Sequence, residues 1–212
     1  MKKCRNCQTD NDDSAILCKN CGAILYNPDE TFTRINHLCI LFGDVVGFTS
    51  LSETLDPEFI TNILDVFFSK VREIISERGG FINRIIGDEF MAVFGFPVYN
   101  ENSIVNAFDS AIEILKFLKE YNFNPVSNNT VKKIHIRMGL ECGSVTIGMD
   151  RDNPYSLIVY GDTVFFASKL EKLSDVDGIT VGRNAFDTLK NTHNFKPLEK
   201  EDITGYTYIE NG

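Results

Sequence analysis

Two apolar segments, each interrupted by an aspartate, constrain the fold more than any other feature of the sequence. The first covers residues 41–49, and its hydrophobic run breaks at Asp44 and again at Gly47. Such a run is typical of a buried strand that ends in a tight turn, where the backbone can approach a phosphate. The second covers residues 81–94 and has Gly87-Asp88 between two apolar stretches, which predicts a β-hairpin. We therefore expect one aspartate at the end of a strand and another in a hairpin turn.

The two aspartates have two interpretations. Asp44 and Asp88, held in this way, could share two divalent cations about 3.5–4 Å apart, the arrangement that clamps the attacking and leaving oxygens in phosphoryl transfer. The simpler alternative is that each is a turn residue whose carboxylate accepts hydrogen bonds from nearby backbone amides. From composition alone, that second interpretation is the more common one for a single turn aspartate.

Size and charge exclude several classes of function. The chain has 212 residues, 43% of them hydrophobic, which suffices for one main domain and a small appendage. A net charge of −9 and a pI near 4.9 argue against nonspecific nucleic-acid binding and against attraction to anionic membranes. No apolar run reaches the ~20 residues of a membrane helix, and the amino terminus has no apolar signal core. We expect a cytoplasmic protein that binds neither nucleic acid nor membrane.

Four of the six cysteines lie within the first 21 residues, in the pattern Cys4-x2-Cys7-x10-Cys18-x2-Cys21. This spacing is typical of two thiolate knuckles that hold one zinc ion in a tetrahedron. A segment this short cannot bury a core, so the metal would supply most of its folding free energy. Because four thiolates leave no open coordination position, we expect a structural Zn²⁺. A redox dithiol pair and an iron centre with the same ligands are the alternatives.

The chain divides into three predicted parts. Residues 1–25 form a zinc ribbon, which we expect to present a docking surface to a protein that the sequence does not name. Residues 26–33 are polar and turn-rich and form a linker, and residues 34–212 form the main domain. Within that domain, Cys39 and Cys142 lie in apolar, strand-like segments and are interpreted as buried thiols.

Hydrophobic periodicity predicts the elements of the main domain. In chain order we expect a strand (36–46), a helix (57–78), a hairpin (81–94), a helix (104–118), two strands (134–140 and 144–147), a short strand (155–160), a helix (162–173), and then a strand, a helix and two closing strands. Asp56 is the predicted N-cap of the first helix, and Asp162 or Thr163 that of the third. This order predicts a ferredoxin-like α+β fold, an antiparallel sheet that carries helices on one face.

From Leu38 to about Leu189 the sequence resembles the class III nucleotide cyclase catalytic domain, the adenylate and guanylate cyclase homology family. The motifs that carry the resemblance are FGDVVGFT (42–49), GG (79–80), GDEFMAVFG (87–95), RMGL (137–140) with Gly143, and GDTV (161–164) with Ala167-Ser168. The resemblance implies conversion of ATP or GTP to a 3′,5′-cyclic nucleotide and pyrophosphate. It also implies two Mg²⁺ or Mn²⁺ ions per site, bound by Asp44, Asp88 and the carbonyl of Val45.

The same resemblance implies a phosphate cradle and a dimer. Gly47, Phe48 and Thr49 follow the first metal ligand and match the family's phosphate-binding backbone. Family members work as head-to-tail dimers, in which the metal aspartates of one chain meet the base-reading and transition-state residues of the other. A homodimer is therefore implied, and a heterodimer with another cyclase domain is the alternative.

Four positions on the partner side of the site depart from the family pattern. The two base-reading positions hold Arg84, where Lys or Glu is usual, and Ile158, where Asp, Thr or Cys is usual. The two transition-state positions hold Phe165 in place of Asn and Lys169 in place of Arg. Phe165 cannot orient a ribose by hydrogen bonding, and Lys169 keeps a positive charge without the planar fork of arginine. An arginine at position 84 could address guanine O6 and N7, or it could pair with an acidic neighbour, so both bases remain candidates.

Three functions follow from these residues. In the first, the chain is a nucleotide cyclase in which Asp44, Asp88 and Lys169 are catalytic. In the second, it is a cyclase-like module that binds nucleotide, dimerises and acts as a regulatory subunit. The third is a diguanylate cyclase, suggested by the letters GDEF, but Ile86 occupies the position of that family's first glycine.

Overall fold

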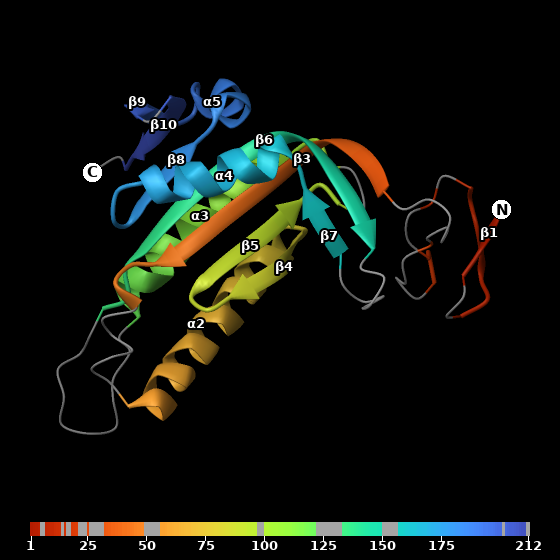
Figure 1. The fold of residues 1–212 in the computed structure, drawn as a ribbon, viewed down its shortest axis with the longest axis horizontal. Coiled ribbons are helices and arrows are strands. Elements are labelled where there is room, and N and C mark those ends of the chain that lie inside the picture. The colour runs from red at the N-terminus through yellow and green to blue at the C-terminus, as the bar shows by residue number, and fades with distance from the viewer. Residues whose placement is uncertain are drawn as a thin grey trace.

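The computed structural model describes residues 1–4, 7–13, 15, 18–20, 25, 32–48, 56–96, 100–121, 133–149, 157–200 and 202–210. Its main feature is an eight-stranded sheet with the strand order β4-β5-β3-β6-β8-β10-β9, in which β7 also pairs with β6 (Figure 1). The strands are β3 (Phe32–Val45), β4 (Gly80–Ile86), β5 (Glu89–Phe94), β6 (Ile136–Met149), β7 (Leu157–Tyr160), β8 (Gly178–Val181), β9 (Asn194–Lys200) and β10 (Ile203–Ile209). The pairing is antiparallel except between β6 and β8, so the expected α+β class is confirmed.

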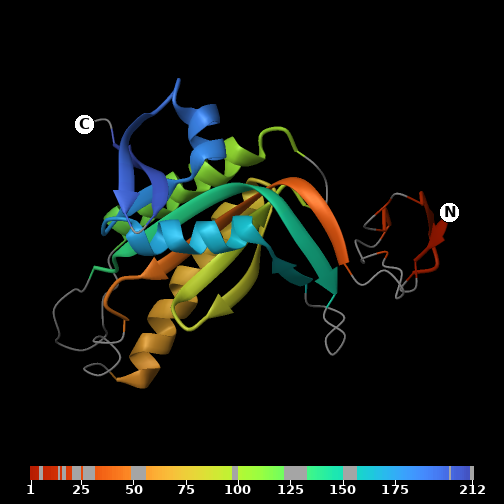
Figure 2. The ribbon, with the colours of Figure 1, turned by 45° about the horizontal axis from the view of Figure 1, so that its top comes forward.

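Helices cover both faces of this sheet, whereas the sequence predicted helices on one face. The helices α2 (Pro57–Glu77) and α3 (Ser103–Glu120) pack on the face that contains Leu41 of β3. The helix α4 (Asp162–Leu173) packs on the opposite face, with Ile40 and Phe42 (Figure 2). Alternate residues of β3 point to opposite faces, and both sets are apolar and buried. Both faces of this strand therefore need a helical cover.

The long strand β6 replaces the two strands expected around Cys142-Gly143. These two residues pair with Cys39 and Leu38 of β3, so the ladder continues through them instead of turning. Cys39 and Cys142 are both buried, as expected, but they form a disulfide and not two separate thiols. The antiparallel register places them directly opposite each other, a relationship that their sequence positions do not reveal.

The helix starts differ in how well the sequence predicted them. The Asp56 side chain accepts a hydrogen bond from the backbone N–H of Glu58, so this predicted N-cap is confirmed. The N-cap of α4 is Gly161, and not Asp162 or Thr163 as expected. Thr163 is instead buried, and its hydroxyl donates to the Ser144 carbonyl at 2.8 Å, which ties the start of α4 to β6.

Two further strands, β1 (Lys2–Lys3) and β2 (Asp10–Asn11), form a separate small sheet near the amino terminus. The strand β3 begins at Phe32, so the last two residues of the expected linker are part of the main sheet. The short helix α5 (Arg183–Leu189) follows β8. Among the described residues, no helix has an apolar stretch long enough to cross a bilayer.

Candidate active site

The two predicted aspartates lie at the same end of the sheet. Asp44 is the last but one residue of β3 and pairs in register with Glu89 of β5. Asp88 lies in the β4–β5 turn, where Gly87 has a positive φ of 63°. The backbone N–H of Val45 donates to the carbonyl of Asp88 at 3.4 Å, so the turn is bound to the end of β3.

Negative charge is concentrated at this end of the sheet. Burial, and next the charge of Asp44, raises the pKa of Asp88 above its usual range. Burial also raises the pKa of Glu89, although nearby Lys172 acts in the opposite direction. Carboxylate oxygens are the ligands that Mg²⁺ and Mn²⁺ prefer, and a cation would offset the repulsion among these groups. The residues present therefore fit divalent cations.

Arg137 and Glu171 adjoin Asp44, and neither was predicted as a site residue. Arg137 of β6 donates from Nη2 to Oδ2 of Asp44 at 2.7 Å, and its Nε lies 3.6 Å from Oε1 of Glu171. Glu171 is 1% exposed, and burial together with the negative charge of Asp44 raises its pKa to about 7. The available sequence signal was a glutamate on the apolar side of α4, between Leu170 and Leu173.

The segment after β3 supplies part of the predicted phosphate cradle. Val46 donates its backbone N–H to the His135 carbonyl at 2.8 Å, which fixes the chain as it leaves the sheet. Gly47 has a φ of 75°, a conformation that strongly favours glycine. Phe48 is partly buried and packs against the core between the sheet, α2 and α3. Thr49, the remaining predicted cradle residue, lies outside the described residues.

A cavity of about 280 Å³ lies between the β4–β5 hairpin, β7 and α4. Its lining is mostly apolar, with a few polar groups; the residues are Phe42, Arg84, Ile86, Glu89, Met91, Val159, Val164, Phe165 and Ser168. Two of the predicted substrate-binding residues, Arg84 and Phe165, are among them. The predicted Ile158 is not among them, whereas its neighbour Val159 is, because successive residues of a strand point to opposite faces.

The two predicted transition-state residues are four positions apart and lie next to each other on the same side of α4. Phe165 is 56% exposed, and the Lys169 ammonium lies 5.6 Å from the centre of its ring, within the range of a cation–π contact. Glu171 is six residues beyond Phe165, or about 9 Å along the helix axis. The first half of α4 thus adjoins the cavity, and its second half adjoins Asp44.

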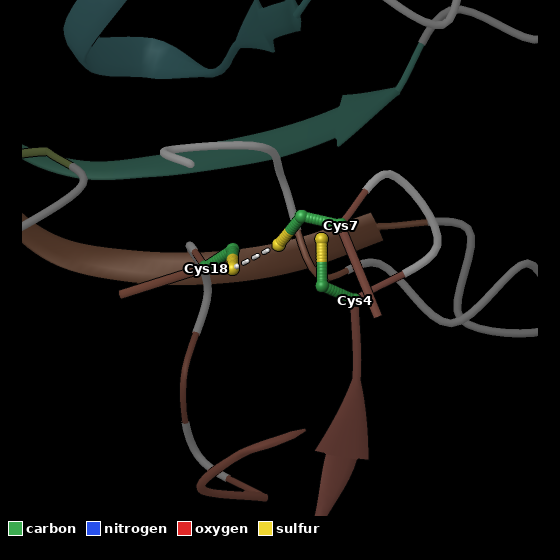
Figure 3. Close-up of side chains that lie close together, drawn as sticks. All are labelled: Cys4, Cys7 and Cys18. Carbon is green, nitrogen blue, oxygen red and sulfur yellow. Dashed lines mark hydrogen bonds between the residues drawn. The ribbon is translucent and has the colours of Figure 1, made fainter. Parts of the chain in front are cut away.

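Three of the four amino-terminal cysteines converge. The Sγ atoms of Cys4, Cys7 and Cys18 all lie within 4.8 Å of one another (Figure 3). Cys4 and Cys18 are buried, and the Nδ2 atom of Asn11 lies 3.7 Å from the Cys18 sulfur. Thiolates that converge in this way fit a thiophilic metal ion such as zinc. Cys21, the fourth cysteine of the pattern, lies outside the described residues.

Comparison with known proteins points to one family. Residues 31–210 match the family described as "Adenylate and Guanylate cyclase catalytic domain". The chain is 32% identical over 161 residues to a receptor-type guanylate cyclase, gcy-23, of Caenorhabditis elegans, an alignment that covers 76% of this chain and 14% of that protein. It is 28% identical over 160 residues to an adenylate cyclase of Mycobacterium bovis, with 74% of this chain and 34% of that protein covered. The chain thus spans well under half the length of these relatives.

The fold is also shared with solved structures. The guanylyl cyclase domain of the RhoGC fusion protein from the aquatic fungus Blastocladiella emersonii superimposes with a TM-score of 0.75 at 24% sequence identity. That superposition covers 84% of this chain and 97% of the fungal domain. At this level of identity, the likeness establishes a common fold.

Proposed function

The chain belongs to the adenylate and guanylate cyclase catalytic domain family, and from that premise we propose that it converts a purine nucleoside triphosphate, ATP or GTP, to a 3′,5′-cyclic nucleotide and pyrophosphate. The observation that carries the proposal is the placement of Asp44 and Asp88. The hydrogen bond from the Val45 N–H to the Asp88 carbonyl holds the two aspartates at one end of the sheet. Asp44 lies three residues before Gly47, where the chain turns.

Asp44, Asp88 and the carbonyl of Val45 would hold two Mg²⁺ or Mn²⁺ ions. When bound, these ions would supply Lewis-acid chemistry that makes the ribose 3′-hydroxyl a nucleophile toward the α-phosphorus. The hard oxygen donors support this assignment, as does the negative charge of Asp44 beside Asp88, which a bound cation would offset.

The other residues would bind and orient the triphosphate. The backbone N–H groups of Gly47, Phe48 and Thr49 would donate to the phosphates. The apolar walls of the cavity, such as Val159 and Phe42, would pack against the base, and Arg84 would donate hydrogen bonds to it. Lys169 would offset the negative charge that develops during attack. In this scheme the 3′-oxygen bonds to the α-phosphorus, and the bond from that phosphorus to the departing pyrophosphate breaks.

We infer that the chain works as a dimer with this face at the interface. Ile86 and Phe165, which border the cavity, are 61% and 56% exposed, and Tyr160 and Phe166 are also exposed. Apolar side chains gathered around a cavity in this way favour cover by another protein surface. In a homodimer, Arg84 and Lys169 of one chain would meet the aspartates of the other.

A second candidate function rests on Phe165. Its ring carries no hydrogen-bonding group for a ribose, and the Lys169 ammonium lies over it. Removing one positioned donor typically costs about 10²–10³ in rate. The alternative is therefore a catalytically weak cyclase-like regulatory subunit, or one half of a heterodimer that supplies Asp44 and Asp88 to a site completed by another cyclase domain.

We further propose that residues 1–25 form a zinc ribbon in which Cys4, Cys7, Cys18 and Cys21 hold one structural Zn²⁺. The convergence of the first three sulfur atoms supports this, as does the spacing of the fourth cysteine in the sequence. The ribbon would be followed by a linker over 26–33 and by the cyclase domain over 34–212. It would offer a docking surface for a protein partner.

The decisive experiment is incubation of the purified chain with Mn²⁺ and either ATP or GTP, followed by chromatography for cyclic nucleotide and pyrophosphate. A cyclic product that is absent with Asp44→Ala protein would establish the enzyme and identify its base. Metal-dependent nucleotide binding without product from either triphosphate would instead favour the regulatory subunit.

A further inference from the structure

We propose that Arg137 is a positioning residue for the metal ligand Asp44, and that buried Glu171 of α4 in turn holds Arg137 in place. The inference rests on the proposed function, because it assigns Asp44 to a divalent cation. It adds two residues to the site that lie outside the predicted metal, cradle and base-reading sets.

Arg137 reaches Asp44 directly across the sheet. The two residues are register partners in β3 and β6, and both point to the face that α4 covers. Their side chains are 31% and 20% exposed, so the ion pair is partly shielded from water. The hydrogen bond from Nη2 engages Oδ2 of Asp44. A bond to one carboxylate oxygen fixes the side-chain rotamer while Oδ1 can still face a cation.

Glu171 supports the same guanidinium from the other side. Its Oε1 lies 3.6 Å from Nε of Arg137, and both atoms are buried without a hydrogen-bond partner among the described residues. When it is ionised, a carboxylate that is 1% exposed requires a nearby positive charge, and a small movement of Arg137 would turn this ion pair into a hydrogen bond. Arg137 is thus shared between two carboxylates.

A close approach of helix and strand makes this sharing possible. Gly139 lies two residues beyond Arg137 on the same face of β6, and a Cβ atom at Gly139 would come within 2.1 Å of the Glu171 backbone nitrogen. The same Cβ would lie 2.4 Å from the Ala167 carbonyl oxygen. Because Gly139 has no side chain, α4 can pack closely against β6 at the point where Glu171 lies beside Arg137.

The consequence is a continuous set of contacts from Asp44 through Arg137 to α4, the helix that also carries Lys169. Residues that orient a metal ligand typically change metal affinity about 10–100-fold when they are removed. A purely structural ion pair would change stability and leave metal affinity unaltered. Metal affinity therefore distinguishes the two roles.

The test measures the Mn²⁺ affinity of the full chain by electron paramagnetic resonance. Only the binding sites that are absent from Asp44→Ala protein are counted. Arg137→Met should weaken binding about 10–100-fold, and Arg137→Lys should recover part of that loss because it retains the charge. The matched control is Arg78→Met, which removes a partly exposed arginine paired with Glu113 between α2 and α3. That variant should bind Mn²⁺ as the wild type does.

Because Arg137→Met removes the positive partner of Glu171, we add the double variant Arg137→Met with Glu171→Gln. It removes one charge of each sign, so the net charge of the region is unchanged and no buried carboxylate loses its partner. Glu171→Gln alone should weaken Mn²⁺ binding several-fold, and the double variant should lose no more affinity than Arg137→Met. Unchanged or tighter binding in folded Arg137→Met protein, or fully additive losses in the double variant, would overturn the inference. Absence of Asp44-dependent binding in the wild type would overturn the metal assignment itself.

Discussion

The backbone N–H of Val45 donates to the carbonyl of Asp88, and this hydrogen bond joins the end of β3 to the β4–β5 turn. The two residues are far apart in the sequence, yet their contact fixes the distance between the two aspartates through the backbone. Because the bond uses main-chain atoms, substitution of either carboxylate should leave this frame intact.

Replacing either aspartate should therefore abolish metal-dependent triphosphate binding without unfolding the chain. Asp44→Ala and Asp88→Ala each remove a hard oxygen ligand from the proposed site. Titration calorimetry with a non-cyclising ATP or GTP analogue and Mn²⁺ would measure the loss. Asp65→Ala, at an exposed position of α2, is the control. Retained affinity in both site variants would refute the proposed metal site.

Restoring the family's residues on α4 should raise turnover. Phe165→Asn supplies a donor for the ribose, and Lys169→Arg supplies a planar fork for phosphate oxygens; together we expect an increase of at least about 10-fold. The fold should tolerate the change, because Phe165 is largely exposed. Phe166→Asn, a change at the adjacent exposed ring, should give no gain. If the double variant is no faster in a cyclic-nucleotide assay, these positions do not limit the reaction.

Glu171 should lower the stability of the fold as pH rises from about 4.5 to about 7. Its native pKa of about 7 exceeds the value of 4.5 expected when unfolded, so the native state binds the proton more tightly. Its contribution is fully present below about pH 4.5 and is lost as pH rises through about 7, a change on the order of 3 kcal/mol.

Glu171→Gln should consequently become more stable relative to the wild type between pH 5 and pH 8. Urea unfolding at several pH values would measure the difference in unfolding free energy. Glu73→Gln, on the surface of α2, should show no such trend. A constant difference between Glu171→Gln and wild type across this range would contradict the raised pKa.

The amino-terminal cysteines should hold one zinc ion per chain. Cys4→Ser or Cys18→Ser removes one buried thiolate and should release the metal, as measured by atomic emission on protein purified without chelator. The circular dichroism of the sheet should remain, because the cyclase domain has its own core. Asp44→Ala protein should keep its zinc. Wild-type protein that contains no zinc would exclude the ribbon.

Local patterns in the sequence predicted the elements near the aspartates well. The Gly87-Asp88 turn lies where the hairpin signal placed it, and α2 begins at Pro57 with Asp56 as its cap. Such features depend on residues a few positions apart, whose conformational preferences act within one turn of chain. Family resemblance then indicated which of these local features belong to one site.

Contacts between distant segments were not predictable in this way. Arg137 and Glu171 could be identified as site residues only from the register of β3 with β6 and from the close packing of α4 against Gly139. For the same reason β6 was expected as two strands, and all the helices were expected on one face of the sheet.

The sequence by itself determined that this chain has a strand ending at Asp44, a turn holding Asp88 and a cysteine pattern suited to zinc. The tertiary structure alone decided that Asp44 shares Arg137 with a buried glutamate 127 positions further along, because side chains so far apart meet through sheet register and helix packing. The conformational preferences of the residues specify the local backbone conformation of each segment. The burial of apolar faces on both sides of β3 specifies which segments meet.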